Sequence, residues 1–293
     1  MSETGLRPSV VVGISTYNRA EILRKSIGSA RAQSYPNRVF VIDDASTDHT
    51  PLIRDDFSNI SWERFEFSQG YVRARNRIIF SSPEDYYVSL DDDAWFLRGD
   101  EIAIAVGLLE AHPNIAAVAY DIVSPDRPQS SQRGVNFFVS MFIGCGHVLR
   151  LSTVKSLGGY SEFPGAYGVE EKDLCLRLIE AGYDIVQLRG VEVWHDKAMT
   201  ARDLSVQHAS GVCNDLAFTV GRFPMIILLP SFAYKLMAHA LFAIRNGLMG
   251  PFIKGLWCFV RAARSAWSLR RPVRMANLSR YQALSKAPQK VGG

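Results

Sequence analysis

The chain has 293 residues, 47% of them hydrophobic and 21% charged, which is an ordinary composition for one large globular domain or two modest ones. Its formal net charge of +4 is too small to indicate a nucleic-acid partner, so none is predicted. The excess of basic residues lies in the C-terminal quarter, and its position matters more than its size.

The first two hundred residues alternate between apolar runs typical of buried strands and stretches with helical periodicity. Repeated strand–helix units imply an α/β fold with a mostly parallel mixed sheet flanked by helices. We expect strands at 9–16, 38–44, 62–67, 85–91 and 115–123, and helices at 20–33, 71–80 and 101–111. Ligands collect at the carboxyl ends of strands in such sheets, where the polar stretches ISTYN, IDDAS and SLDDD lie.

The next segment contains a predicted loop and a further helix. Residues 124–134 are polar and contain proline, which indicates a loop near the site, and 135–151 return to strand character. A helix is predicted over 170–181, because it starts with acids that the helix dipole favours and stops at Gly182. A strand should follow it.

Composition changes after about Asp196, where a C-terminal region rich in Phe, Leu, Met and Trp begins. No segment offers 18 uninterrupted apolar residues, so we expect helices that lie on an anionic membrane surface rather than cross it. The alternative is a helical subdomain or a dimer surface, and the sequence leaves the oligomeric state open. The basic residues of this region include Lys235, Arg245, Lys254, Arg261 and Arg264.

The cysteines and the N-terminus indicate a cytoplasmic protein. Cys145, Cys175, Cys213 and Cys258 are widely spaced and form no CxxC pair, so we expect free thiols in a reducing compartment. The first 15 residues lack the basic start and apolar core of a signal peptide. With its C-terminal region, the protein is expected at the inner face of the membrane.

Three consecutive acids, Asp91, Asp92 and Asp93, follow a strand-like run. Adjacent carboxylates 4 Å apart repel by about 4 kcal/mol at an effective dielectric of about 20. Along an extended chain Asp91 and Asp93 would point one way and Asp92 the other, so two carboxylates could share a site. A bound Mg²⁺ or Mn²⁺ would offset the repulsion, whereas a solvated turn is the alternative.

Other polar clusters accompany this trio. Asp43 and Asp44 end the second strand, where a carboxylate could accept the imide proton of a uracil-type base or simply start a helix. The stretch GYVRARN opens a helix with Arg73 and Arg75, which could attract phosphate or form an exposed basic face. Acids at 170–173 could likewise be ordinary helix-start residues.

Taken together, ISTYNRAEIL, VIDDASTD, GYVRARN, LDDDAWF, GGYSE and YGVEEKDLCLRLIEAGYDI are similar in order and spacing to glycosyltransferase family 2. That family consists of inverting enzymes with the GT-A fold, and the resemblance covers about residues 8–200. It implies a GT-A domain over 1–200, followed by a helical, basic and aromatic region over 201–293.

The resemblance also implies roles for residues on the donor side. Ser15, Thr16 and Tyr17 match the loop that holds the nucleotide, and Asp44 matches the acid that reads the base. Arg75 matches the basic residue near the diphosphate.

In the DxD motif of the family, the position of Asp93 is the usual direct ligand of Mn²⁺ or Mg²⁺. Asp91 or Asp92 would lie nearer the ribose and the sugar. His195 resembles a histidine that contacts the metal or the diphosphate; the alternative is a structural histidine.

Glu171 aligns with the general base of the family. This chain has Glu where Asp is more frequent, which leaves Glu170 and Asp173 as alternatives. The expected reaction moves a sugar, with inversion, from a nucleoside-diphosphate sugar to a hydroxyl of a saccharide or lipid-linked acceptor, in polysaccharide or glycolipid biosynthesis. The alternatives are a nucleotidyltransferase, although STYNRAE lacks the glycine-rich triphosphate loop, and an inactive sugar-nucleotide-binding scaffold.

Overall fold

The computed structural model describes residues 7–128, 134–196, 203–268 and 270–291. Within these residues the strands form one mixed sheet in the order β10-β7-β9-β6-β8-β4-β1-β2-β3, and β5 pairs with β9. The strands are β1 (Val10–Thr16), β2 (Arg38–Asp43), β3 (Ser61–Arg64), β4 (Tyr86–Asp91), β5 (Ala94–Phe96), β6 (Ile115–Val123), β7 (Phe137–Phe138), β8 (Gly146–Arg150), β9 (Asp184–His195) and β10 (Gln289–Lys290).

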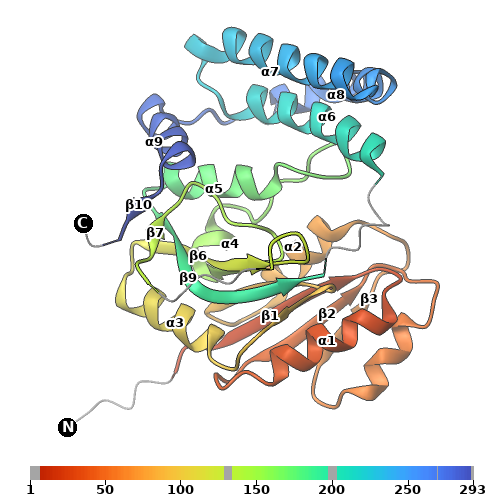
Figure 1. The fold of residues 1–293 in the computed structure, drawn as a ribbon, viewed down its shortest axis with the longest axis vertical. Helices are drawn as coiled ribbons and strands as arrows, with labels where there is room; N and C mark the ends of the chain where they lie inside the picture. Colours follow the sequence, from red (N-terminus) through yellow and green to blue (C-terminus); the bar gives the residue numbers. More distant parts are fainter. Residues whose placement is uncertain (1–6, 129–133, 197–202, 269, 292–293) are drawn as a thin grey trace.

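Helices cover both faces of this sheet (Figure 1). One buried cluster joins the sheet to α1 and α3, and a second joins its other face to α2, α4, α5 and α9. The helices are α1 (Ala20–Arg31), α2 (Tyr71–Ser81), α3 (Glu101–Ala111), α4 (Leu151–Ser156), α5 (Glu170–Glu180), α6 (Leu204–Arg222), α7 (Met225–Asn246), α8 (Met249–Ser268) and α9 (Met275–Lys286), with a 3₁₀ helix over Thr50–Asp56.

The predicted order of strands and helices is confirmed, with local differences. β1, β2, β3 and β4 are parallel neighbours, as the buried β-branched runs predict. β8 runs antiparallel between β4 and β6, so the sheet is mixed. The third strand stops at Arg64 rather than at residue 67. Residues 129–133 of the predicted loop lie outside the described residues.

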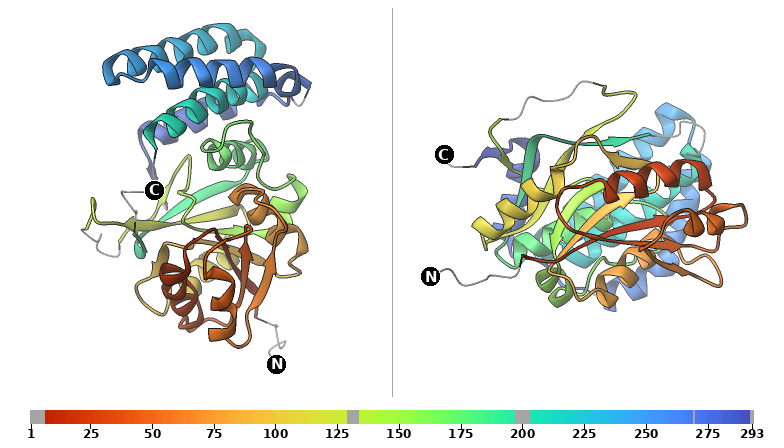
Figure 2. Two further views of the ribbon diagram at one scale, coloured as in Figure 1. Left: turned by 90° about the vertical axis from the view of Figure 1, so that its right-hand side faces the viewer. Right: turned by 90° about the horizontal axis from the view of Figure 1, so that it is seen from below.

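The C-terminal helices form a layer of their own beyond α5, at the end of the molecule away from β1–β3 (Figures 1 and 2). α6, α7 and α8 enclose a small apolar core, which includes Val212, Leu216 and Phe259. α9 returns to pack on α5. The C-terminal helices are therefore joined to the sheet domain by packed contacts.

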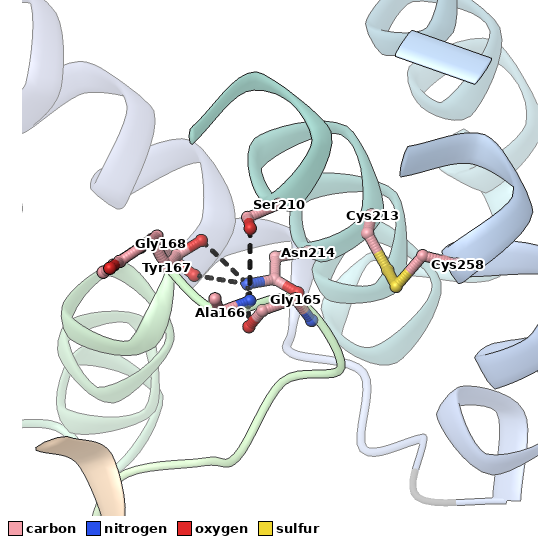
Figure 3. Close-up of a disulfide and its surroundings, with 8 residues drawn as sticks. All are labelled: Gly165, Ala166, Tyr167, Gly168, Ser210, Cys213, Asn214 and Cys258. Atoms are coloured by element: carbon pink, nitrogen blue, oxygen red, sulfur yellow. Dashed lines mark hydrogen bonds between the residues drawn. A yellow bond between two sulfur atoms is a disulfide. The ribbon is translucent and has the colours of Figure 1, made fainter. Parts of the chain in front are cut away.

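The expectation that all four cysteines are free is wrong for one pair. Cys213 on α6 and Cys258 on α8 form a disulfide, with Cα atoms 5.7 Å apart (Figure 3). Their 45-residue separation carries no local signal, because the pairing depends on how two helices pack. Cys145 and Cys175 are free and buried, as expected.

One C-terminal helix is long and apolar enough to cross a membrane, although the sequence has no uninterrupted apolar run of 18 residues. By length and composition, α7 could cross one, with a mean hydropathy of 1.6 over an 18-residue window that is not buried inside the molecule. Counting only uninterrupted apolar residues missed it, because Pro230, Ser231 and Lys235 interrupt the run.

Candidate active site

The polar residues that follow β1, β2 and β4 lie at one edge of the sheet. Parallel pairing places Ser15 opposite Asp91, and Thr16 opposite Asp43. The backbone N–H of Asp44 donates to the carbonyl of Thr16 at 2.9 Å, which ties the first two strand ends together. Three of the predicted clusters therefore meet, as expected for the carboxyl ends of neighbouring parallel strands.

The three consecutive aspartates do not alternate, because the strand ends at Asp91 and the chain turns through Asp92 and Asp93 before β5. Nη1 of Arg19 lies 2.5 Å from Oδ2 of Asp93 and 3.4 Å from Oδ1 of Asp92. Burial raises the pKa of Asp92 to about 7, despite the opposing effect of Arg19. The charge of Arg19 thus offsets part of the repulsion within the trio.

A second arginine, Arg75 of α2, bridges the trio to α5. Its side chain is only 5% exposed, and its guanidinium lies 2.8 Å from Oδ1 of Asp91 and 2.8 Å from Oε1 of Glu171. It also donates to the carbonyl oxygen of Gly144 at 3.2 Å. A buried guanidinium needs such compensation, since an unpaired buried charge is strongly destabilising. Arg75 therefore fixes Asp91 and Glu171 relative to each other.

Glu171 lies in the first turn of α5, with Glu170 beside it in sequence. Burial raises the pKa of Glu171 to about 7; Arg75 opposes this shift, and the negative charge of Glu170 adds to it. Glu170 accepts a hydrogen bond from the hydroxyl of Tyr71. A carboxylate with a pKa near neutrality can take up a proton at physiological pH.

Asp173, the third acid of this helix, is fully occupied by structural contacts. Its carboxylate lies 2.7 Å from Nε of Arg177 and 2.5 Å from Nε of Arg222, and Ser161 donates to it at 2.6 Å. Burial alone would raise the pKa of this carboxylate, but the two arginines outweigh burial and hold the pKa below its usual range. These contacts leave Asp173 poorly suited to accept a proton in a reaction.

Side chains that could bind a divalent cation gather where β4 and β9 end. Ligand atoms of Asp91, Cys145 and His195 lie within 4.8 Å of one another, and Nε2 of His195 lies 3.2 Å from Oδ1 of Asp93. Nδ1 of His195 is buried and has no hydrogen-bond partner among the described residues. Burial raises the pKa of the Cys145 thiol, and thiolates are soft ligands that suit other metals. The carboxylates of Asp91 and Asp93 are the groups here that suit Mn²⁺ or Mg²⁺.

The donor-side residues predicted near the nucleotide lie around the ends of β1 and β2. Thr16 is buried with its hydroxyl unpartnered among the described residues, and Tyr17 is half exposed. The carboxylate of Asp44 accepts hydrogen bonds from Ser68 (2.7 Å) and from the backbone N–H groups of residues 69 (2.6 Å) and 70 (2.9 Å). Asp44 therefore also anchors the loop before α2, and little of its acceptor capacity remains for a base.

A surface groove lies apart from these residues, between the end of β3 and α2. Its volume is about 660 Å³, and its lining includes Phe65, Arg73, Arg77, Phe80 and Glu162. Because its arginines all pair with acids, Arg64 with Asp43, Arg73 with Glu162 and Arg77 with Glu63, we assign it no part in the site.

Residues 11–151 match the sequence profile of Glycosyl transferase family 2. The chain therefore carries a glycosyltransferase family 2 domain. The matched segment contains Arg19, Asp44, Arg75 and the aspartate trio, and it ends before α5.

Two relatives are named as glycosyltransferases and a third as a biosynthesis protein. EpsE of Bacillus subtilis (strain 168), named as a glycosyltransferase, is 29% identical over 196 residues, or 61% of this chain and 69% of EpsE. The pre-mycofactocin glycosyltransferase of Mycobacterium tuberculosis (strain CDC 1551 / Oshkosh) is 29% identical over 66% of this chain and 44% of its own length. The succinoglycan biosynthesis protein ExoU of Rhizobium meliloti (strain 1021) is 33% identical over 31% of this chain and 28% of ExoU.

Solved structures show that this glycosyltransferase has the GT-A fold. TarS 1-349 of S. aureus, in complex with UDP-GlcNAc, matches with a TM-score of 0.64 and 15% identity over 95% of this chain and 91% of that chain. The mannosyltransferase PcManGT of Pyrobaculum calidifontis, in complex with GDP-Man and Mn²⁺, matches with a TM-score of 0.60 and 19% identity over 96% and 84%.

Several residues of this glycosyltransferase site were not predicted. Arg19 lies in the loop after the first strand, so the strand-end rule could have included it. Gly144 and Cys145 lie in a segment read only as strand, and no local pattern marks them. Tyr71 begins the same helix as Arg73 and Arg75, but no prediction included its hydroxyl as a site group.

Proposed function

We propose that this family 2 glycosyltransferase is a metal-dependent, inverting enzyme that moves a sugar from a nucleoside-diphosphate sugar to an acceptor hydroxyl. The observation that carries the proposal is the contact of Arg75 with both Asp91 and Glu171. This contact places a guanidinium, and a carboxyl group whose pKa burial raises to about 7, beside the DxD aspartates. A nucleotidyltransferase is the weaker alternative, because the family match is to glycosyltransferases.

The donor would bind along the ends of β1, β2 and β4. In this proposal Ser15, Thr16 and Tyr17 contact the nucleotide, and Asp44 lies at the base. Asp91 and Asp92 then lie toward the ribose and sugar. The guanidinium of Arg75 stabilises negative charge that develops on the departing diphosphate.

Asp93 and His195 would hold the divalent cation, with Asp91 close by. When bound, Mn²⁺ or Mg²⁺ supplies positive charge that stabilises the leaving diphosphate. Arg19, which pairs with Asp93, would have to share or release that carboxylate. The solved neighbour PcManGT contains Mn²⁺ together with its sugar nucleotide, which supports the same chemistry here.

Glu171 would act as the general base. Its carboxylate accepts the proton of the acceptor hydroxyl, and the hydroxyl oxygen attacks the anomeric carbon from the face opposite the diphosphate. Attack from that face inverts the configuration. Arg75 orients Glu171, and burial keeps the pKa of Glu171 near 7, where it can both accept and release a proton.

The test is a panel of sugar nucleotides, with and without Mn²⁺, read first by thermal shift. We expect at least one uridine, thymidine or guanosine diphosphate sugar to raise the melting temperature, with a larger shift when Mn²⁺ is present. The donor selected in this way is then incubated with Mn²⁺, and release of the nucleoside diphosphate is measured. Binding without any release in the presence of saccharide acceptors would favour the inactive scaffold.

We also propose that residues 201–293 form a helical region that rests on an anionic membrane and brings the enzyme to a lipid-linked acceptor. α7 and α8 expose large apolar side chains, including Ile226 (81%), Leu229 (77%) and Trp257 (59%). The exposed basic residues Arg245, Lys254, Arg261 and Arg264 lie on the same two helices. Apolar side chains with neighbouring cations are typical of helices that lie in the membrane interface.

A peripheral position fits the contacts of α7 better than a crossing. Lys235 of α7 lies 2.5 Å from Asp215 of α6, and His239 lies 3.5 Å from the same carboxylate, so polar groups fasten α7 to the rest of the protein. The relative ExoU is named for succinoglycan biosynthesis, which supports a role in polysaccharide or glycolipid biosynthesis; for that role we propose a position at the cytoplasmic face of the membrane.

Flotation with vesicles tests this placement. The full chain should float with phosphatidylglycerol vesicles and less with phosphatidylcholine vesicles. Ile226→Ser, Leu229→Ser and Trp257→Ser combined should abolish flotation. Leu52→Ser with Phe67→Ser is the matched control, since both side chains are more than half exposed but belong to the sheet domain. Equal flotation of the triple variant and the control would contradict the membrane role.

A further inference from the structure

Two side chains of α6 hold the loop before α5, and the buried Asn214 makes most of the hydrogen bonds (Figure 3). Asn214 is 1% exposed. Its Oδ1 accepts from the backbone N–H of Gly165 at 2.6 Å. The two hydrogens of its Nδ2 are shared among the carbonyl oxygens of Gly165 (3.1 Å), Tyr167 (2.9 Å) and Gly168 (3.1 Å). One amide group thus bonds main-chain groups of three of the four residues from 165 to 168.

A second side chain of α6 supports the same loop. The hydroxyl of Ser210, one turn before Asn214, accepts from the backbone N–H of Ala166 at 3.2 Å. Gly165 fits against α6 closely: a Cβ there would lie 2.8 Å from Oδ1 of Asn214 and 2.8 Å from Cα of Ser210. Any larger residue at 165 would push the loop away from α6.

The loop enters α5 through a strained backbone. Gly168 has a φ of 90° and Val169 a φ of 75°, a conformation that β-branched residues rarely adopt. Such residues persist only where their surroundings hold them. The bonds of Asn214 to residues 165–168 end immediately before Val169, so they supply that restraint.

This restraint lies next to the proposed base. Val169 precedes Glu170 and Glu171, and its carbonyl oxygen accepts the N–H of Asp173 at 2.7 Å in the first turn of α5. The half-exposed ring of Tyr167 stacks on Tyr71 at 6.4 Å. A shift of the loop would therefore move the start of the helix that carries Glu171.

α6 is itself well anchored. A disulfide joins Cys213, the neighbour of Asn214, to Cys258 of α8. The two helices also approach closely at Gly255 of α8, where a Cβ would collide with the carbonyl oxygen of Ala209. Asp215, the next residue, lies 2.8 Å from Lys172 of α5. Asn214 is thus part of a rigid helix that also contacts α5 directly.

We propose that Asn214 is a positioning residue, which fixes the main chain of residues 165–168 and thereby aims Glu171 at the reacting hydroxyl. The inference rests on the proposed function, in that Glu171 is the base. It assigns part of the catalytic geometry to the C-terminal helical region, which the sequence indicated as a membrane-facing extension, with a helical subdomain or a dimer surface as the alternative.

Hydrogen exchange tests the restraint without needing activity. In Asn214→Ala, amides of residues 165–171 should exchange at least about tenfold faster than in the wild type. Gly165→Ala should show the same change from the loop side. The controls are Thr219→Val, which removes a buried hydroxyl of α6 that bonds only within its helix at 2.7 Å, and Gly211→Ala, whose added methyl meets nothing within 4 Å.

Kinetics then test whether the restraint serves catalysis. With the donor chosen by thermal shift and with Mn²⁺, kcat for nucleoside diphosphate release should fall about 10- to 100-fold in Asn214→Ala and in Gly165→Ala, because a misplacement of about 1 Å can cost that much. The Kd for the donor should stay within about twofold. Thr219→Val and Gly211→Ala should keep the wild-type kcat, which separates positioning from a general loss of stability.

The outcomes distinguish this inference from the proposed function. If the wild type releases no diphosphate from any donor, the proposed function fails, and unchanged exchange in Asn214→Ala would overturn the restraint as well. If the wild type is active, a wild-type kcat in Asn214→Ala overturns the inference, regardless of the hydrogen-exchange rates of this variant. Should Asn214→Ala not fold, Ser210→Ala, which removes only the bond to Ala166, replaces it in both measurements.

Discussion

The guanidinium of Arg75 lies 2.8 Å from the carboxylate of Glu171, although 96 residues separate them in the sequence. The same guanidinium lies 2.8 Å from Asp91, so one buried side chain connects α2, α5 and the end of β4. A cation placed in this way can orient the proposed base and also stabilise the leaving group.

Glu171→Gln should lower kcat at least about 100-fold and leave the Kd for the donor within about threefold. The amide keeps the size of the side chain but cannot accept the proton, and general-base catalysis typically contributes about 10²- to 10⁴-fold. Nucleoside diphosphate release and calorimetric titration with the donor provide the two measurements. Turnover equal to that of the wild type would move the role of base to Glu170.

The pH dependence of kcat/KM should show an acidic limb with an apparent pKa of about 7. Burial raises the pKa of Glu171 to about 7, with Arg75 opposing and Glu170 adding to the shift. A base is active when deprotonated, so kcat/KM should rise about tenfold per pH unit below 7 and level off above it.

Burial raises the pKa of Asp92 to about 7 as well, so Asp92 could produce the same acidic limb and a control variant is needed. The acidic limb should remain in Asp92→Asn, even if the rate falls, and should disappear from the residual activity of Glu171→Gln. A limb that vanishes in Asp92→Asn alone would assign the titration to the aspartate trio instead.

Gly144→Ala should reduce kcat about as strongly as Glu171→Gln while the protein stays folded. A Cβ at this position would collide with Oε1 of Glu171 and lie 3.0 Å from Nη2 of Arg75, so the pair would have to separate. Gly107→Ala on α3 is a suitable control, because its added methyl meets nothing within 4 Å. Wild-type kcat in Gly144→Ala would show that the Arg75–Glu171 contact is dispensable.

The sequence predicted most of the sheet domain, because buried parallel strands and amphipathic helices leave strong periodic patterns. β1, β2, β4 and α5 lie within about two residues of their expected positions. The strand-end rule correctly grouped Ser15, Asp44 and Asp91 at one edge. These are consequences of local pattern and of general sheet geometry.

Contacts between distant segments could not be predicted in the same way. The pairing of Arg19 with Asp93, and of Cys213 with Cys258, depends on how loops and helices pack. Nothing in the sequence around Asn214 shows that its amide meets the loop before α5, because a buried Asn in an apolar helix has no periodic signature. The composition of 223–269 indicated a membrane-facing surface, whereas α6, which precedes this segment, is largely buried between the sheet domain and the other C-terminal helices.

Asp173→Asn tests the acid that the resemblance left open as an alternative base. We expect it to lower the free energy of unfolding by about 3–5 kcal/mol at pH 7, because it leaves Arg177 and Arg222 without their buried counter-charge. Although burial raises the pKa of Asp173, the arginines lower it below the usual range. The carboxylate therefore stabilises the fold above its ordinary pKa of about 3.9, and this contribution is lost as the pH falls through the lower folded-state pKa.

Urea unfolding at pH 7 measures this loss, and Asp56→Asn is the control. Asp56 pairs with Arg24 at 2.5 Å, but both side chains are more than 40% exposed, so this variant should change the free energy of unfolding by less than about 1 kcal/mol. The folded fraction of Asp173→Asn should keep the acidic limb near pH 7. If Asp173→Asn were as stable as the wild type and inactive, Asp173 would belong to the chemistry and Glu171 would lose the role of base.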